Sequence, residues 1–173
     1  MWAGRHVVLG VSGGIASYKS CVLARRLTEA GASVDVVLTR GAAEFVRAPL
    51  FEGLTGRSVL TSLWESGGAL SHVRLGQSAD LIIVAPATAH LIARAAQGLA
   101  DDVLTALLLA GTAPLLLAPA MNDEMYAHPA TQANLERLRA RGVEIEIQPL
   151  KDSSLVSALV MYGPLILLVA IWF

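Results

Sequence analysis

VVLGVSGGIA, at residues 7–16, is the stretch that decides the fold. Its aliphatic start at 7–9 is typical of a buried strand, and helical spacing of apolar residues begins at Ile15. Ser12-Gly13-Gly14 lies between them, at the N-terminus of the expected helix. Glycines let the backbone approach an anion closely, and the unpaired N–H groups of a helix N-terminus carry a partial positive charge. We therefore predict a phosphate site here; the alternative is a tight turn that needs glycine only for its shape.

Two further turns follow β-type runs in the same way. They are Pro86-Ala87-Thr88-Ala89 and Pro119-Ala120-Met121-Asn122. Ligands of an open parallel sheet bind at the carboxyl ends of its strands, so the three turns are expected to converge on one ligand. Thr88 is suited to bond a ring or ribitol group, and the uncharged amide of Asn122 is suited to hold a substrate. The alternative for both residues is an ordinary helix N-cap.

The rest of the chain alternates strand-like and helix-like segments. This alternation predicts an α/β fold, a doubly wound parallel sheet of three layers that is Rossmann- or flavodoxin-like, with right-handed crossovers. Ile15, Tyr18, Val22, Leu23 and Leu27 fall on one side of the first helix, as in an amphipathic helix. The predicted strands are 7–9, 34–38, 81–85, 115–118 and 143–147. The predicted helices are 15–30, 42–46, 89–97, a helix capped by Asp101 or Asp102 that runs through Ala110, and 131–140, with a short helix or turn at 50–56 and a glycine-rich loop at 66–69.

Composition and spacing exclude several classes of partner. With 13 basic and 14 acidic residues the net charge is -1, which gives no electrostatic footprint for nucleic acid. The strand at 34–38 ends in Leu38-Thr39-Arg40, without the acidic residue that holds a dinucleotide ribose, so a mononucleotide is favoured over NAD.

The one cysteine, Cys21, forms no internal disulfide, and no histidine pair has metal-ligand spacing. No long apolar secretory stretch opens the sequence, and we expect a cytoplasmic location.

His72 is the candidate acid or base. It lies in LSHVRL, residues 70–75, between the glycine loop and the third strand. A histidine titrates near neutrality and can give or take a proton in a reaction. The alternative is a surface or helix-capping histidine.

Taken together, these motifs resemble the homo-oligomeric flavin-containing cysteine decarboxylases, and within them the branch that decarboxylates 4'-phosphopantothenoylcysteine in coenzyme A biosynthesis. The likeness covers about residues 5–147, with Tyr126 where the family usually has tryptophan. No single motif identifies this family, but the motifs taken together, in this order and at this spacing, are specific for it. The matching segments are 10–16, 71–73, 79–81, 85–89, 98–102 and 119–126.

The resemblance implies FMN as cofactor and assigns roles to particular residues. His72 matches the family's catalytic histidine, and Asn122, with Met121 beside it, matches the substrate site, where the asparagine holds the carboxylate. The residues that match the cofactor site are Ser12, Gly13, Gly14 and Ile15 at the phosphate turn, Thr39 along the flavin, and Thr88, Ala89 and Ala120 near the ring.

The resemblance also implies a reaction. A cysteine carboxylate loses carbon dioxide poorly because the resulting carbanion has no electron sink. Oxidation of the thiol-bearing carbon by FMN gives a thioaldehyde, which accepts the electrons on decarboxylation. We expect conversion of 4'-phosphopantothenoylcysteine to 4'-phosphopantetheine; the alternative is oxidative decarboxylation of a peptide's C-terminal cysteine to an enethiol. A catalytically dead flavin-binding subunit and a prenyl-transferring flavin enzyme are weaker alternatives, because His72 and the 119–122 motif are present.

The resemblance further implies a homo-oligomer, a trimer or a dodecamer, with flavin at a subunit interface. We expect a flavoprotein domain at 1–147 and an atypical apolar tail at 148–173, without a charge from Ser153 onward. The tail is long enough to cross a bilayer, but buried segments in an oligomer or an aberrant terminus are the favoured interpretations, and a membrane role is disfavoured. The family's glycine-rich flap with Ala-Cys-Gly has no counterpart here, which puts the reductive half of the reaction in doubt.

Overall fold

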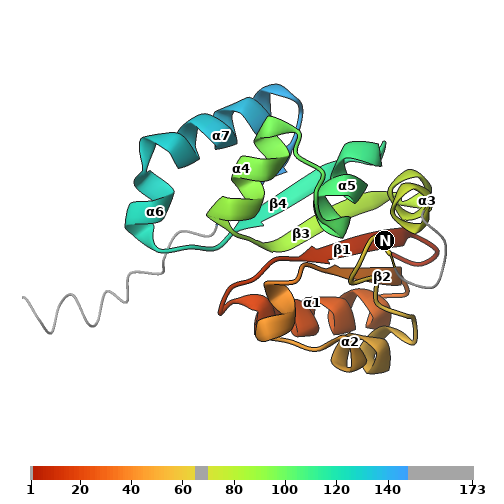
Figure 1. Ribbon diagram of the computed structural model, residues 1–173. Coiled ribbons are helices and arrows are strands. Elements are labelled where there is room, and N and C mark those ends of the chain that lie inside the picture. Colours follow the sequence, from red (N-terminus) through yellow and green to blue (C-terminus); the bar gives the residue numbers. More distant parts are fainter. Residues whose placement is uncertain (1, 65–69, 148–173) are drawn as a thin grey trace, which may run out of the picture.

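Five parallel strands form one sheet in the order β2-β1-β3-β4-β5 (Figure 1). The computed structural model describes residues 2–64 and 70–147; the predicted loop at 66–69 and the tail at 148–173 lie outside them. This strand order is that of the flavodoxin-like doubly wound sheets, so the predicted fold class is confirmed. The strands are β1 (His6–Val11), β2 (Ser33–Leu38), β3 (Leu81–Ala87), β4 (Leu115–Pro119) and β5 (Glu144–Ile145).

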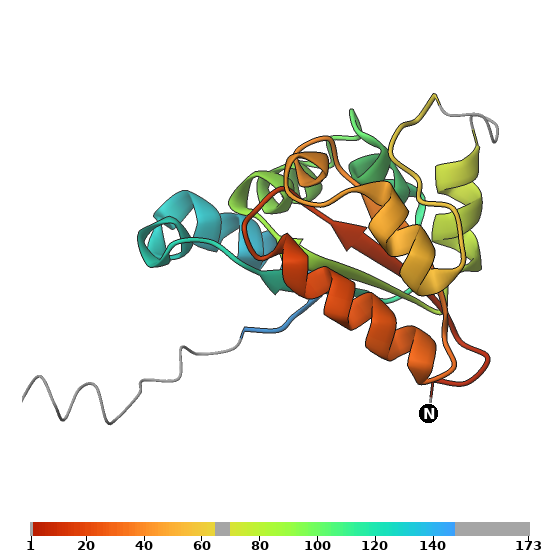
Figure 2. The same cartoon turned by 90° about the horizontal axis from the view of Figure 1, so that it is seen from below.

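Helices cover both faces of the sheet and make the outer two of three layers. Figure 2 shows α1 (Ser17–Glu29) and α2 (Ala48–Thr55) over the face seen from below. The opposite face carries α3 (Ser71–Ser78), α4 (Ala89–Gln97), α5 (Val103–Ala110) and α7 (Pro129–Ala140), while η1 (Ala42–Glu44) and α6 (Asp123–Ala127) follow β2 and β4. Alternate residues of β1 enter different cores, Val7 and Leu9 on the α1 side and Val8 on the other.

The side of α1 that faces the sheet is only partly the side predicted from its apolar residues. Leu27 is buried and Leu23 packs against the core, as predicted, but Ile15, Tyr18 and Val22 are 83%, 60% and 49% exposed. Toward the start of the helix Ser17 and Ser20 are buried instead, because small side chains let the helix lie close to the sheet. The Ser20 hydroxyl donates to the carbonyl of Ala85 at 2.5 Å. The amphipathic interpretation was therefore wrong for Ile15, Tyr18 and Val22, which leave an apolar stripe on the outer side.

Other boundaries differ in smaller ways. The predicted helix at 42–46 is the single 3₁₀ turn η1, and the predicted strand at 143–147 is only the two residues of β5. The helix predicted at 50–56 begins earlier, at Ala48, with a proline in its first turn, where the missing N–H costs nothing. α3 has no counterpart among the predicted elements.

Candidate functional site

The turn after β1 leads into a helix whose N-terminus has no side-chain cap. α1 has neither a capping hydrogen bond nor an acidic residue in its first turn. Within the described part of the chain, the N–H groups of Gly13, Ile15 and Ala16 donate to no acceptor. Unpaired N–H groups at the positive end of a helix attract anions. The turn therefore offers a site for a phosphate, through its backbone.

Ser12 joins the turn after β1 to the turn after β3. Its side chain is buried, and its hydroxyl donates to the carbonyl of Pro86 at 2.7 Å and accepts from the N–H of Thr88 at 3.0 Å. The hydroxyl hydrogen is thus engaged within the protein rather than presented to a ligand. Thr88 in turn accepts the N–H of Leu91 at 3.3 Å and caps α4, as the alternative interpretation of this residue expected. Ala89 is the first residue of α4, beside this junction.

Gly13 brings the loop after β2 against the same turn. A Cβ on Gly13 would lie 2.5 Å from the carbonyl carbon of Gly41, closer than real Cβ contacts. The Thr39 hydroxyl accepts the N–H of Ala42 at 3.1 Å, which fixes the start of that loop. A Cβ on Gly14 would lie 3.5 Å from the methyl carbon of Thr88, an ordinary contact. Three loops therefore meet at the carboxyl edge of the sheet.

The turn after β4 completes this edge. The N–H of Ala120 donates to the carbonyl of Ala87 at 3.1 Å, which joins it to the end of β3. Met121 is half-buried and packs against the core, whereas Asn122 is exposed. The side-chain oxygen of Asn122 caps α6 by accepting the N–H of Glu124 at 2.9 Å. Its amide nitrogen donates to no acceptor in the described part of the chain, and is available to a carboxylate.

We call these four turns, residues 12–16, 39–41, 86–89 and 120–122, the cradle. The sequence-based expectation that the turns after β1, β3 and β4 converge is confirmed by the contacts between them. Gly41 was missed, although a glycine two residues after Thr39 is the kind of signal that could have revealed it.

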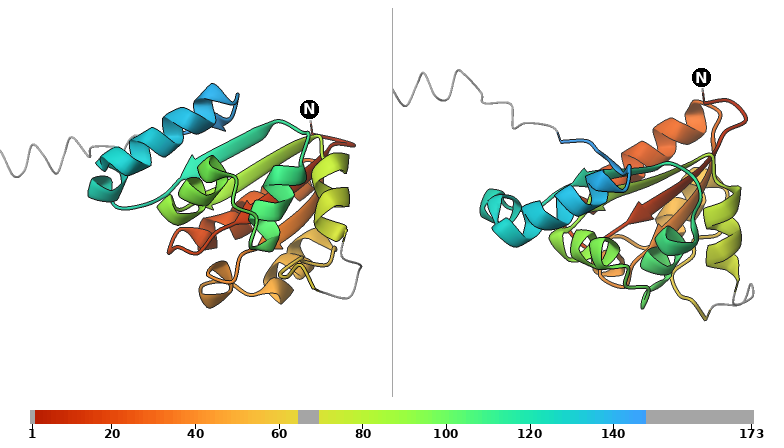
Figure 3. Two further views of the ribbon diagram at one scale, coloured as in Figure 1. Left: turned by 45° about the horizontal axis from the view of Figure 1, so that its top comes forward. Right: turned by 90° about the horizontal axis from the view of Figure 1, so that it is seen from above.

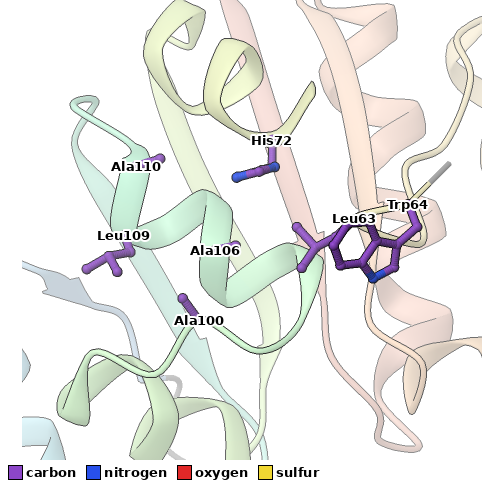
Figure 4. A pocket seen from close by; sticks show the side chains of 7 residues that line it. All are labelled: Leu63, Trp64, His72, Ala100, Ala106, Leu109 and Ala110. Carbon is purple, nitrogen blue, oxygen red and sulfur yellow. The ribbon is translucent and has the colours of Figure 1, made fainter. Parts of the chain in front are cut away.

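His72 does not lie in the cradle of its own chain. It points into a cavity of about 430 Å³ between α3, α5 and the segment before residue 65 (Figure 4). Both views of Figure 3 show α3 at one end of the sheet and the turns of the cradle at the other. The lining is otherwise apolar, which left no sequence signal, and consists of Leu63, Trp64, His72, Ala100, Ala106, Leu109 and Ala110.

Cys21 lies on α1, half-buried against the core on that side of the sheet. Burial raises the pKa of its thiol, and a hydrogen bond with its own backbone opposes this only in part. Its place within the first helix, packed against the core, does not match that of a cysteine on a flap. In residues 2–64 and 70–147 there is also no group of three metal-ligating side chains and no helix long and apolar enough to cross a bilayer.

Comparison with known proteins assigns the family. The model of the family described as Flavoprotein matches residues 1–161. The chain belongs to the Flavoprotein family. This membership confirms the resemblance drawn from the motifs.

Two curated relatives within this family carry the same name. The coenzyme A biosynthesis bifunctional protein CoaBC of Mycolicibacterium smegmatis is 52% identical over 145 residues, which are 84% of this chain and 35% of that protein. CoaBC of Vibrio vulnificus is 48% identical over 145 residues, or 83% of this chain and 36% of that protein. The chain thus spans about a third of the length of these relatives.

Solved structures of the family share the fold closely. The FMN-dependent cysteine decarboxylase SpaF superposes with a TM-score of 0.81 and 32% identity, over 94% of this chain and 99% of that one. A mutant PPC decarboxylase complexed with pantothenoylaminoethenethiol superposes with a TM-score of 0.71 and 30% identity, over 82% of this chain and 81% of that one. Both similarities span the strands and helices that build the cradle.

Proposed function

We propose that this chain binds FMN and decarboxylates 4'-phosphopantothenoylcysteine to 4'-phosphopantetheine. The observation that carries the proposal is its 52% identity to CoaBC, a coenzyme A biosynthesis protein, over 84% of the chain. The similarity to SpaF and to PPC decarboxylase supports the same cofactor and the same bond cleavage. A cytoplasmic location fits this activity.

The cradle fits a flavin mononucleotide chemically. The free N–H groups of Gly13 and Ile15 lie at an uncapped helix N-terminus, where they suit a dianionic phosphate. Ser12 shapes this turn rather than donating to the phosphate, and Thr39 borders it. Thr88, Ala89 and Ala120 offer small side chains against which a flat ring can lie. When bound, FMN supplies the electron sink that the decarboxylation of a cysteine needs.

The chain's own side chains position and protonate the substrate. The free amide nitrogen of Asn122 binds the substrate carboxylate, and Met121 forms part of the same turn. His72 takes the thiol proton as the sulfur-bearing carbon is oxidised, because imidazole is a base near neutral pH.

A complete site on this proposal needs two copies of the chain. The turns of the cradle and α3, which carries His72, lie at opposite ends of one sheet (Figure 3). On this proposal the histidine of one copy therefore meets the cradle of another. The exposed apolar stripe of Ile15, Tyr18 and Val22 begins in the cradle and offers a surface for the second copy. We therefore propose a homo-oligomer, a trimer or a dodecamer of such trimers.

A second candidate reaction is oxidative decarboxylation of a peptide's C-terminal cysteine to an enethiol. The position of Cys21 inside α1 favours it. An enethiol product needs no cysteine to return a proton.

Product analysis distinguishes these reactions. The purified protein is incubated with 4'-phosphopantothenoylcysteine or with a peptide ending in cysteine, and carbon dioxide and product mass are recorded. 4'-Phosphopantetheine is the expected product. The enethiol of the first substrate shows that the reductive half is missing, turnover of the peptide alone assigns the second reaction, and no turnover of either refutes both.

A further inference from the structure

A charged cluster lies toward the amino edge of the sheet, away from the cradle. Its members are His6, Asp35 and Arg57. Asp35 belongs to β2 and is only 6% exposed. The Arg57 guanidinium donates to both of its oxygens, through Nε at 2.7 Å and Nη2 at 3.0 Å, the two-pronged geometry of a strong ion pair. This pairing with Asp35 raises the pKa of Arg57. The proposed reaction uses none of the three residues.

His6 connects this carboxylate to α3. Its Nε2 lies 2.6 Å from Oδ2 of Asp35, and its Nδ1 lies 3.0 Å from the carbonyl oxygen of Ser78, the last residue of α3. The Ser78 hydroxyl lies 3.4 Å from the same Nδ1, so the end of α3 meets the imidazole through both its carbonyl and its side chain. The cluster thus joins Arg57 and the end of α3 to one buried carboxylate.

The backbone of His6 is itself fixed to the start of β3. Its N–H donates to Oδ2 of Asp80 at 2.8 Å, and its carbonyl accepts the N–H of Asp80, also at 2.8 Å. The first of these bonds is the main reason that the pKa of Asp80 is lowered, with the Arg5 ion pair adding to it against the cost of burial. The backbone of His6 is therefore fixed in position, and so are the contacts of its ring with Asp35 and Ser78.

The cluster ties both ends of the stretch 57–78. After Arg57 the chain runs along the outer edge of β2, where Leu60 exchanges backbone hydrogen bonds of 2.9 Å with Val36 and Leu38. It then reaches Leu63 and Trp64, which line one side of the cavity. The stretch ends with α3, which carries His72. Three of the seven residues that line the cavity thus lie in a stretch whose two ends are both connected to Asp35. Arg57 binds this carboxylate directly, and Ser78 is connected to it through His6.

α3 also touches α5, on the other side of the cavity, through backbone atoms. Gly76 is one helical turn after His72, and a Cβ there would lie 3.0 Å from the Leu107 carbonyl oxygen and 3.1 Å from Cα of Gly111. The carbonyl of Gly76 accepts the N–H of Thr112 at 3.3 Å. α3 is therefore set between α5 and the cluster, and its position determines where His72 points.

We propose that His6, Asp35 and Arg57 are positioning residues for the His72 cavity. Asp35 holds one wall through Arg57 and the other through His6. This proposal depends on the proposed function in one respect only, namely that His72 takes part in the reaction. The spacing of the two walls is a property of the fold and is measured without substrate.

Hydrogen exchange of the full-length protein, followed by mass spectrometry of peptides, tests this directly. Asp35→Asn removes the shared charge, and exchange is expected to rise about tenfold in both 58–64 and 71–78, because hydrogen bonds to charged groups are lost at both ends. Arg57→Gln should raise it in 58–64 alone, and His6→Leu in 71–78 alone. The cradle and α7 should exchange as in the wild-type protein.

Arg25→Gln is the matched control, since it breaks an exposed arginine–carboxylate pair of 2.7 Å, with Glu29, on α1. It should leave both peptides unchanged. A variant that exchanges faster throughout, α7 included, shows that the cluster stabilises the whole fold and overturns the proposal. Exchange that stays at the wild-type rate in 71–78 of both Asp35→Asn and His6→Leu overturns it as well.

Activity provides a second readout that a purely structural role would not give. All three variants should keep the flavin content of the wild-type protein while kcat falls, because the cradle is untouched and His72 is displaced. Loss of flavin together with kcat contradicts a positioning role. If the wild-type protein decarboxylates neither substrate, the proposed function fails alone, and the exchange pattern still decides the role of the cluster.

Discussion

At Gly13 the backbones of two loops meet with no room for a side chain. Gly13→Ala would place a methyl group 2.5 Å from the Gly41 carbonyl carbon, and the neighbouring atoms are backbone that cannot rotate away. We expect the variant to lose about 1–3 kcal/mol of stability by overpacking, and to bind less flavin as the cradle opens. Thermal unfolding and the ratio of flavin to protein measure the two effects.

Gly53→Ala is the control for this substitution. Gly53 lies in α2, and a Cβ there meets nothing within 4 Å. It should stabilise the protein by about 0.5–1 kcal/mol, because alanine loses less backbone entropy in a helix. Equal behaviour of the two alanine variants would show that the Gly13–Gly41 contact has no consequence.

Because His72 lies away from the cradle, its replacement should stop the reaction without affecting flavin binding. His72→Asn should abolish carbon dioxide release while the purified protein keeps its flavin, because asparagine cannot serve as a base near neutral pH. His128→Asn is a suitable control: His128 caps α7, and asparagine is itself a good cap. Wild-type turnover in His72→Asn would show that His72 takes no part in the reaction.

At the scale of elements, the stability of α5 depends on its N-cap, the residue just before its first turn. Asp102 accepts the N–H groups of Leu104 and Thr105, both at 2.9 Å, in a capping box. Asp102→Ala should cost about 1 kcal/mol in the free energy of unfolding, measured by denaturant titration. Asp102→Asn keeps the cap and should retain most of that stability. A full loss in both variants would mean that the charge of Asp102, rather than the cap, is what α5 needs.

Local signals predicted those elements whose ends have caps. The helix predicted at 89–97 begins and ends there in the structure, because Thr88 caps it and Gly98 takes a left-handed conformation after it. α3 was not predicted because its helical state depends on a tertiary contact, the close approach of Gly76 to α5. The buried side of α1 was predicted wrongly in its first turns, because Ser17 and Ser20 are buried there and donate their hydroxyls to the carbonyls of Ser12 and Ala85.

At the scale of the whole molecule, the cradle could be predicted from the sequence and the position of His72 could not. Turns that follow parallel strands must share an edge, which the alternation of segments already implied. The cavity of His72 is built from alanines and leucines of other elements, residues that carry no pattern in the chain. Only the folded structure shows that α3, which carries His72, lies apart from the turns of the cradle (Figure 3).

Because His72 lies away from the cradle of its own chain, two different variant chains should complement each other in a mixed oligomer. A His72→Asn chain, which is inactive alone, and a Gly13→Ala chain, which binds less flavin alone, should be more active together when co-expressed, since some mixed sites combine an intact histidine with an intact cradle. Turnover per bound flavin in the purified mixed oligomer measures it. Activity no greater than that of the separate variants would place both residues in a site formed by one chain.

The visible spectrum of the purified protein, recorded without oxygen before and after addition of 4'-phosphopantothenoylcysteine, tests the central claim most directly. We predict a yellow protein whose flavin band bleaches as the sulfur-bearing carbon is oxidised, with recovery of the band if the reductive half follows. A protein without flavin, or one whose band is unchanged by this substrate and by a peptide ending in cysteine, would contradict the account.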